Sequence, residues 1–321
     1  MPQFDLALPE LCRYAPVLAE PTDLDAFWAS TLDAARASAP VLSAVPVATG
    51  LRLVDTWDVT FAGFGGDPVR AWLSRPAGAT GALPAVVEFA GYGRGRGLPH
   101  ERLTWVTAGY AHLLMDNRGQ GDRYGNGGDT PDPHAGGFQP VTRGILSPHD
   151  YYYRRLITDA VRAVDAVRAL PGVDPARVAA LGNSQGGGLA LAVAGLVPDL
   201  AALLATAPFL CHVERAVALT DAAPYGEIAQ YLAVHRDAAE QVWRTLSYMD
   251  GVHLARRAAA PGHFGTGLRD PVCPPSTVFA AYNAYGGADR TMLTYPFNGH
   301  EGGDAVHVRR QLDWLAAKLA A

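Results

Sequence analysis

Short apolar runs that alternate with helix-like segments constrain the fold of this chain more than any other feature. From residue 84 onward, four such runs have the length and composition of strands buried on both faces of a sheet, namely residues 85–89, 111–115, 178–181 and 202–206. Between the second and third runs, apolar residues from 156 to 167 fall on one side of a helix and charged residues on the other. Because strands that alternate with helices form parallel crossover units, the sequence predicts an α/β fold with a doubly wound, mostly parallel sheet and helices on both faces.

The rest of the 321 residues fits a single domain, 1–321, around that sheet. Residues 1–45 predict an N-terminal arm with one helix from about 23 to 37, and residues 51–73 alternate like strands. Further strands are expected at 263–267 and 291–295, followed by a helix from about residue 304. Residues 209–258 are helical in pattern and rich in polar residues, so they predict an insertion over the strand ends, a candidate lid.

Composition argues against several classes of partner. With 26 Lys and Arg against 31 Asp and Glu, the net charge is -5, so no overall positive field exists to hold a nucleic acid. The longest uncharged apolar run, about 188–197, is shorter than the roughly 20 residues that a membrane span needs. The first residues show no secretory pattern. We therefore expect a cytoplasmic protein with neither a nucleic-acid nor a membrane partner.

The cysteines predict no disulfide framework. Cys12, Cys211 and Cys273 are odd in number, lie far apart and include no CxxC pair, which also argues against a structural zinc site. We expect reduced, mostly buried thiols, with Cys273 partly exposed beside its two prolines.

The strongest local signal for chemistry is the G-x-S-x-G motif at residues 182–186. It directly follows a predicted buried strand and precedes an apolar helix at 187–197. Small residues allow a tight strand-to-helix turn that holds the hydroxyl of Ser184 above the sheet, where the N–H of Gln185 can face a developing oxyanion. The alternative is an ordinary helix start capped by Ser184 or Asn183.

A serine hydroxyl needs a base, and in this fold class the partners follow in the order Ser, acid, His. His300 is the candidate base, because it lies in a glycine-rich loop after the last predicted strand, although a surface histidine is the alternative. Asp270 is the candidate acid because it begins the loop after the preceding strand, and a turn-forming aspartate is the alternative. The other candidates are less well placed: Asp289 and Asp250 for the acid, and, for the base, His212 and His235 in the insertion and His307, expected to face solvent.

The loop after the strand at 85–89 predicts the second oxyanion donor, the N–H of Tyr92 between two glycines, although it could be a simple tight turn. The glycines at 91–97, followed by Asp116, suggest a dinucleotide site, but the G-x-G-x-x-G spacing is absent. Two groups of possible metal ligands lack ligand spacing: Asp129, Asp132 and His134, and then His300, Glu301 and Asp304. We expect no cofactor and no metal.

Several further motifs lie in a consistent order along the chain. Arg118-Gly119-Gln120 precedes the serine motif, and His300-Glu301 follows it; longer stretches at 142–146, 151–155, 244–248 and 270–277 belong to the same pattern. With these residues, nearly the whole chain resembles the acetyl xylan esterase and cephalosporin C deacetylase family of serine esterases, carbohydrate esterase family 7.

This resemblance implies an α/β-hydrolase fold, removal of acetyl groups from short xylo-oligosaccharides and cephalosporin C, and no cofactor. It also implies cytoplasmic location and a homohexamer whose sites open into an internal chamber. By matching positions, the triad is Ser184, Asp270 and His300, and the oxyanion hole is Tyr92 and Gln185. Arg118, Gln120 and Glu301 would then support these groups from behind.

Four residues depart from the family pattern. Arg94 and Arg96 make the loop after Tyr92 more basic, which could alter the preferred leaving group, and Gly262 and His263 occupy strand positions where apolar residues are usual. A broader short-chain esterase or peptidase of the same fold, or a hydrolase-like binding protein without chemistry, are the alternative functions.

Overall fold

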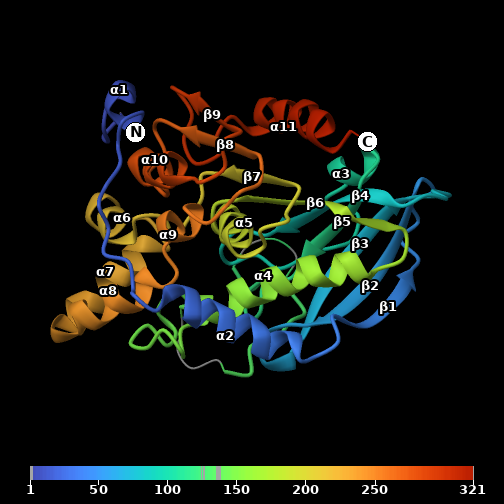
Figure 1. Cartoon of the computed structure of the whole chain (residues 1–321), viewed down its shortest axis with the longest axis horizontal. Helices are drawn as coiled ribbons and strands as arrows, with labels where there is room; N and C mark the ends of the chain where they lie inside the picture. Colours follow the sequence, from blue (N-terminus) through green and yellow to red (C-terminus); the bar gives the residue numbers. More distant parts are fainter. Residues whose placement is uncertain (1–2, 124, 126, 135–138, 321) are drawn as a thin grey trace.

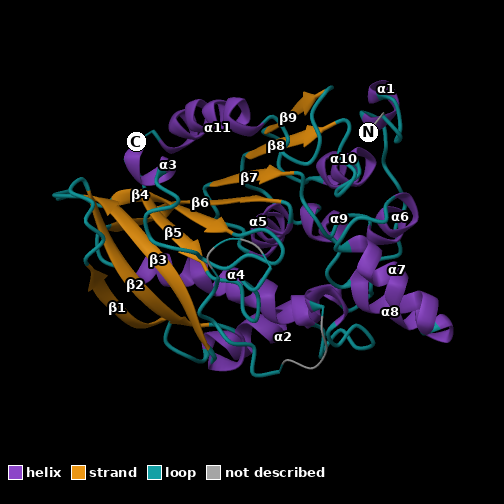
Figure 2. Ribbon diagram, turned by 180° about the vertical axis from the view of Figure 1, so that it is seen from behind, coloured by secondary structure: helices purple, strands orange, loops and turns teal. Residues whose placement is uncertain are grey.

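A single mixed sheet organises the part of the chain that the computed structural model describes, residues 3–123, 125, 127–134 and 139–320. The strand order is β1-β2-β3-β5-β4-β6-β7-β8-β9. The strands are β1 (Val41–Val47), β2 (Val54–Ala62), β3 (Pro68–Pro76), β4 (Leu83–Phe89), β5 (Ala111–Met115), β6 (Val173–Asn183), β7 (Ala202–Thr206), β8 (Gly262–Gly267) and β9 (Arg290–Tyr295). Pairing is antiparallel from β1 through β3 to β5 and parallel from β5 through β4 to β9 (Figure 2).

Helices cover both faces of this sheet (Figure 1). The helices are α1 (Leu8–Leu11), α2 (Leu24–Arg36), α3 (Thr104–Thr107), α4 (Tyr152–Ala169), α5 (Gln185–Leu196), α6 (Val213–Leu219), α7 (Tyr225–Val234), α8 (Ala239–Ser247), α9 (Gly251–Ala255), α10 (Pro275–Ala284) and α11 (Asp304–Leu319), with short 3-10 turns at Phe64–Gly66, Pro140–Thr142 and Arg236–Ala238. Apolar residues of α2, α4 and α5 pack in one core with β2 to β7, whereas α3 and α11 pack on the opposite face. The predicted doubly wound α/β fold is confirmed.

The apolar stripe of α4 explains why it lies against the sheet. Leu156, Ile157, Val161 and Val164 are fully buried, and each such side chain contributes roughly 1.5–3 kcal/mol by leaving water. Burial on both faces likewise accounts for the continuous apolar runs of β5 and β7, in which every residue is buried.

The expected strand and helix positions agree closely with the observed bounds. The strand at 202–206 coincides with β7, and the helix expected from about 23 to 37 is α2. Residues 51–73 form most of a β2–β3 hairpin, while β1 begins at Val41, within the expected arm. Residues 209–258 contain α6 to α9, which lie beyond the carboxyl ends of β7 and β8 (Figure 2).

Three expectations about burial need separate comment. Cys273 is fully buried, so its expected partial exposure is wrong; Cys12 is the exposed thiol. His307 is buried rather than facing solvent, because α11 turns it toward β7 and β9. His263 is accommodated in β8 by the rings of His307 and Trp314, 5.2 and 5.3 Å away between centroids. Within the described residues, no helix combines the length and the apolar character needed to traverse a lipid bilayer.

Candidate active site

The turn between β6 and α5 presents Ser184 in an unusual backbone conformation. Its φ is 61° and its ψ is -123°, a combination that a side-chain-bearing residue adopts only when its surroundings enforce it. The flanking glycines are required by close approach: a Cβ on Gly182 would lie 2.1 Å from the carbonyl carbon of Gly186, and one on Gly186 would lie 2.0 Å from the carbonyl oxygen of Phe89. Ser184 makes no capping hydrogen bond to the described residues, which argues against the helix-cap alternative.

His300 and Asp270 form a direct pair. Nδ1 of His300 lies 2.9 Å from Oδ2 of Asp270. The Asp270 carboxylate is fully buried, and its other oxygen accepts the backbone N–H groups of Val272 at 2.8 Å and Cys273 at 3.0 Å. The carboxylate is therefore fixed by the backbone on one side and can orient the imidazole on the other.

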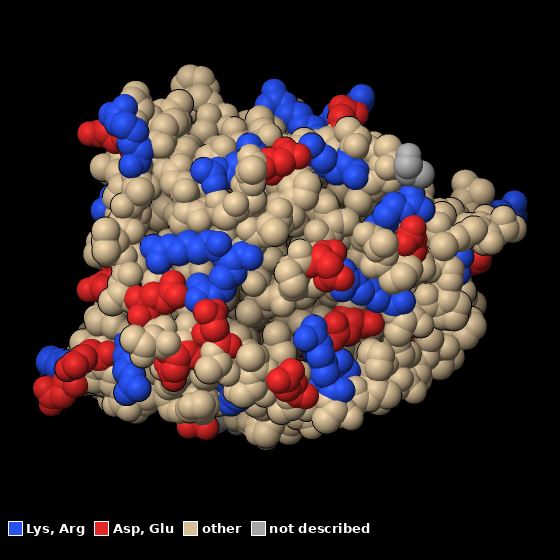
Figure 3. Space-filling model, in the orientation of Figure 1, with Lys and Arg blue, Asp and Glu red and all other residues tan. Residues whose placement is uncertain are grey.

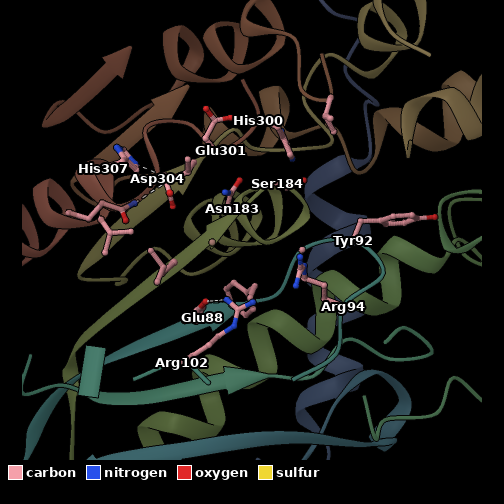
Figure 4. Close-up of a pocket in the computed structure, with 18 of the residues that line it drawn as sticks. Glu88, Tyr92, Arg94, Arg102, Asn183, Ser184, His300, Glu301, Asp304 and His307 are labelled. Atoms are coloured by element: carbon pink, nitrogen blue, oxygen red, sulfur yellow. Dashed lines mark hydrogen bonds and ion pairs between the residues drawn. The ribbon is translucent and has the colours of Figure 1, made fainter. Parts of the chain in front are cut away.

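Ser184 belongs to the same site as the His300–Asp270 pair. Ser184 and His300 line one cavity, and Figure 4 shows the two residues beside each other. Cys273 lies between the two sides of the site: its N–H donates to Asp270, and Ser184 is near enough to its thiol to lower the pKa of that thiol. Burial is the larger influence, so the pKa of the thiol is raised overall.

The competing acids and bases are engaged elsewhere. Asp289 pairs with Lys318 at 2.6 Å, and Asp250 caps α9 through the N–H of Val252. His307 binds Thr206 and Tyr295, and Nδ1 of His212 lies 3.2 Å from the hydroxyl of Tyr14. His235 is exposed at the end of α7.

The loop after β4 carries the candidate oxyanion donor. Tyr92 lines the cavity, and the next amide, that of Gly93, already donates to Oε1 of Gln120 at 2.6 Å. Within the described residues, neither the Tyr92 N–H nor the Gln185 N–H has an acceptor. Both groups are thus available to a ligand, which is the condition for an oxyanion hole.

Gln120 joins the two loops that carry these donors. Besides Gly93, it binds Oε1 of Gln185 at 3.0 Å and the hydroxyl of Tyr152 at 2.8 Å, all in a buried network. Two unpredicted residues after β5 assist it. The Asn117 amide donates to three carbonyls of the 90–94 segment, and Asp116 accepts the N–H of Arg96 at 2.7 Å.

Arg118 and Glu301 fix the conformations of the loops in which they lie. Arg118 is buried and binds Asp159 through two nitrogens at 2.5 and 2.7 Å, so it ties its loop to α4. Glu301 accepts the Asn298 amide at 2.8 Å, a hydrogen bond that lowers the pKa of Glu301. It also accepts the N–H of Gly299 and so shapes the loop that carries His300.

The cavity has a volume of about 710 Å³ and a mixed polar and apolar lining. Charged side chains of both signs line it, namely Arg94, Arg102, Arg123, Glu88, Glu101, Glu301 and Asp304. Burial would raise the pKa of Glu88, but contacts with His112 and Arg102 outweigh it and lower the value to about 2. The face of the molecule in Figure 3 also shows interspersed charges. The lining thus carries no excess of positive charge of the kind that would favour a polyanion.

Arg96 does not belong to this lining. Its guanidinium is buried, stacks 3.7 Å from the ring centroid of Trp72, and pairs with Asp58 and Asp129 at 2.8 and 2.7 Å. The expectation that Arg94 and Arg96 together make this loop basic thus holds only for Arg94.

The acidic residues of the 116–134 region serve the backbone and neighbouring arginines. Asp116 accepts three backbone N–H groups, and Asp132 pairs with Arg155 at 3.2 Å. In the part of the chain that the structure describes, no group of three His, Cys, Asp or Glu is arranged to hold a metal ion.

The mostly parallel sheet, the strained serine at the strand-to-helix turn and the order Ser, Asp, His define the class of this protein: it is an α/β hydrolase. Residues 1–318 match the acetyl xylan esterase (AXE1) family. The chain belongs to this family, whose members are carboxylic ester hydrolases.

Three similar proteins carry related descriptions. The structure of an acetyl xylan esterase from Paenibacillus sp. R4 is 37% identical, with a TM-score of 0.91 over 97% of this chain and 99% of that chain. Acetyl xylan esterase 1 from Thermoanaerobacterium sp. JW/SL YS485 is 30% identical, with a TM-score of 0.90 over 99% of this chain and 100% of that chain. Acetyl esterase Axe7A from Xylanibacter ruminicola is 28% identical over 91% of this chain, which spans 66% of that relative's length.

Proposed function

We propose that this protein is a serine esterase that removes acetyl groups from small esters. Ser184 is the nucleophile, His300 the general base, and Asp270 the residue that orients the imidazole. The N–H groups of Tyr92 and Gln185 bind the oxyanion, and Arg118, Gln120 and Glu301 support the loops that carry these groups. The observation that supports this most strongly is the 2.9 Å contact between His300 and Asp270 beside the cavity that Ser184 also lines.

The reaction proceeds in two acyl-transfer steps. His300 takes the hydroxyl proton while the oxygen of Ser184 attacks the ester carbonyl carbon, and the two amides stabilise the oxyanion. Collapse of this intermediate expels the alcohol, which receives the proton from His300, and leaves Ser184 acetylated. Water activated by His300 then attacks the acetyl group, so that acetate leaves and Ser184 recovers its proton.

Acetylated xylo-oligosaccharides and cephalosporin C are the proposed substrates. Family membership and the names of the three relatives support an acetyl ester, and the mixed lining of the 710 Å³ cavity fits a polar alcohol group. The further features that the sequence resemblance implies, a homohexamer and a cytoplasmic location, belong to the same proposal. So does the single-domain organisation with an N-terminal arm, 1–45, and residues 209–258 as a lid over the site.

Acetate release tests this proposal. The wild type and Ser184→Ala are compared on acetylated xylo-oligosaccharides and cephalosporin C, with butyrate esters of the same alcohols and a peptide substrate as controls. The proposal predicts acetate release by the wild type, weak turnover of butyrates and the peptide, and a loss in kcat of roughly 10⁴ to 10⁶ for Ser184→Ala. Equal turnover of butyrates would indicate a broad esterase. Peptide cleavage would indicate a peptidase, and no turnover of any of them a binding protein.

A further inference from the structure

The loop that carries Tyr92 is held from two directions. The first set of contacts comes from the segment after β5: Gln120 accepts the Gly93 N–H, and Asn117 donates to the carbonyls of residues 90, 91 and 94. The second contact comes from the segment 209–258, which is far from Tyr92 in the sequence. Glu227 of α7 accepts a hydrogen bond from the hydroxyl of Tyr92 at 2.6 Å between Oη and Oε2.

Glu227 makes specific buried contacts instead of facing solvent. It is only 4% exposed, although it is a glutamate. Its second oxygen accepts a hydrogen bond from Nη1 of Arg123 at 2.9 Å, so the buried charge has both a hydrogen-bond donor and a counter-ion. A buried carboxylate without such partners would be strongly destabilising, which makes the pairing with Tyr92 part of what keeps Glu227 in place.

Tyr92 is a donor in this contact. Burial and the Glu227 carboxylate raise the pKa of the phenol well above its ordinary value, so the hydroxyl keeps its proton. The hydroxyl also accepts a weaker hydrogen bond from the N–H of Val141 at 3.4 Å. The side chain of Tyr92 is thereby fixed at its far end, while the adjacent Gly93 amide fixes the backbone at the near end.

We propose that Glu227 is a positioning residue for the oxyanion hole. By binding the Tyr92 hydroxyl, it keeps the Tyr92 N–H pointing at the oxyanion that forms when Ser184 attacks the ester carbonyl. This inference rests on the proposed function, in which the Tyr92 N–H binds the oxyanion. Glu227 acts through Tyr92 and touches no reacting atom. Since Pro224, at the start of α7, lines the same cavity, the insertion contributes both a wall of the site and part of its catalytic geometry.

The test compares Glu227→Ala, Glu227→Gln and Tyr92→Phe with the wild type in the full chain. Glu214→Ala is the matched control, because Glu214 is an exposed glutamate on α6 of the same insertion and does not line the cavity. Each variant is assayed for kcat and KM on an acetyl ester, with active sites counted by phosphonate titration. A trifluoromethyl ketone is the second probe, because its hemiketal with Ser184 places a negative oxygen in the oxyanion hole.

Glu227→Ala and Tyr92→Phe should lower kcat by roughly 10- to 100-fold per titrated site, less than the 10²–10³ for loss of a whole donor. KM should stay within about twofold, and trifluoromethyl ketone binding should weaken in parallel with kcat. Glu227→Gln has a single amide oxygen for two donors, Tyr92 and Arg123, so its kcat should lie between those of Glu227→Ala and the wild type; the double variant Tyr92→Phe/Glu227→Ala should be no worse than the worse single variant. Glu214→Ala should match the wild type.

The inference is overturned if Glu227→Ala loses thermal stability while its kcat per titrated site and its ketone affinity stay within twofold of wild type. That result is the signature of a purely structural residue. If Glu227→Ala fails to fold, Tyr92→Phe, which removes only a hydroxyl, decides by the same criteria. Failure of the proposed function is seen separately, as a wild type that neither releases acetate nor reacts with the phosphonate, and the inference would then fall with it.

Discussion

The carboxylate of Asp270 is shared between the backbone and His300: one oxygen accepts two N–H groups, and the other lies 2.9 Å from Nδ1 of the imidazole. Because Asp270 is fully buried at the start of the loop after β8, its side chain has no freedom to serve another partner. Nδ1 of His300 must then carry the proton of this contact, which leaves Nε2 as the basic nitrogen.

Replacing Asp270 by Asn tests this arrangement. The amide can offer an N–H where the carboxylate accepts one, and this favours the wrong imidazole tautomer. We expect kcat on an acetyl ester to fall by roughly 10³ to 10⁴, with a circular dichroism spectrum like that of the wild type. A loss smaller than tenfold would show that Asp270 does not orient His300.

Gly186→Ala tests the close packing of the serine turn. The new Cβ would lie 2.0 Å from the carbonyl oxygen of Phe89, a backbone atom that cannot move without displacing the loop that carries Tyr92. We expect destabilisation of roughly 1–3 kcal/mol in urea unfolding, together with a lower kcat. Gly81→Ala is the control, since a Cβ there meets nothing within 4 Å, and it should change stability by less than about 0.5 kcal/mol.

Arg118→Met tests the ion pair beneath the site. Asp159 is fully buried and Arg118 is its main partner, so removal of the guanidinium leaves an uncompensated charge. We expect a loss of roughly 3–5 kcal/mol in the free energy of unfolding. Arg36→Met, which breaks the exposed pair with Asp165, should cost less than about 1 kcal/mol, and equal losses in the two variants would contradict the account.

The buried histidines predict a pH dependence of stability. Burial lowers the pKa of His307 to about 3 and that of His263 to about 4, below the roughly 6.5 of an unfolded histidine. Between about pH 6.5 and these lower pKa values, the unfolded chain binds more protons than the folded protein does. The contribution of the two neutral histidines to stability is therefore complete above about pH 6.5 and is lost as the pH falls toward 4 and 3. The Tm measured from pH 7 to 4 should therefore decline less steeply in His307→Gln than in the wild type.

The matched control is His235→Gln, at an exposed position at the end of α7. It should leave the slope of Tm against pH unchanged. A slope for His307→Gln equal to that of the wild type would show that His307 does not stay neutral in the folded state.

Much of the fold could be predicted because the apolar pattern and the topology agree. The short, continuous apolar runs at 202–206 and 111–115 indicate strands buried on both faces, and both strands are observed with those bounds. The serine turn could also be placed, because Gly182 and Gly186 are needed by backbone contacts that adjoin Ser184 in the sequence.

Contacts between distant segments could not be predicted in the same way. The glutamate at 227 looks like one more solvated charge on a helical segment, and only the packing of α7 beside the β4 loop brings it to Tyr92. Helical spacing alone does not show how α11 is rotated against β7 and β9, so it does not predict the burial of His307. The burial of Cys273 beside Ser184 likewise depends on how the Asp270 loop folds back over the turn.

The most direct test of the central claim is covalent labelling by a serine-reactive fluorophosphonate, followed by peptide mass spectrometry. The account predicts one adduct, on Ser184, that is absent in Ser184→Ala and forms roughly 10²–10⁴ times more slowly in His300→Ala. An adduct on any other serine, or an unchanged labelling rate in His300→Ala, would contradict it.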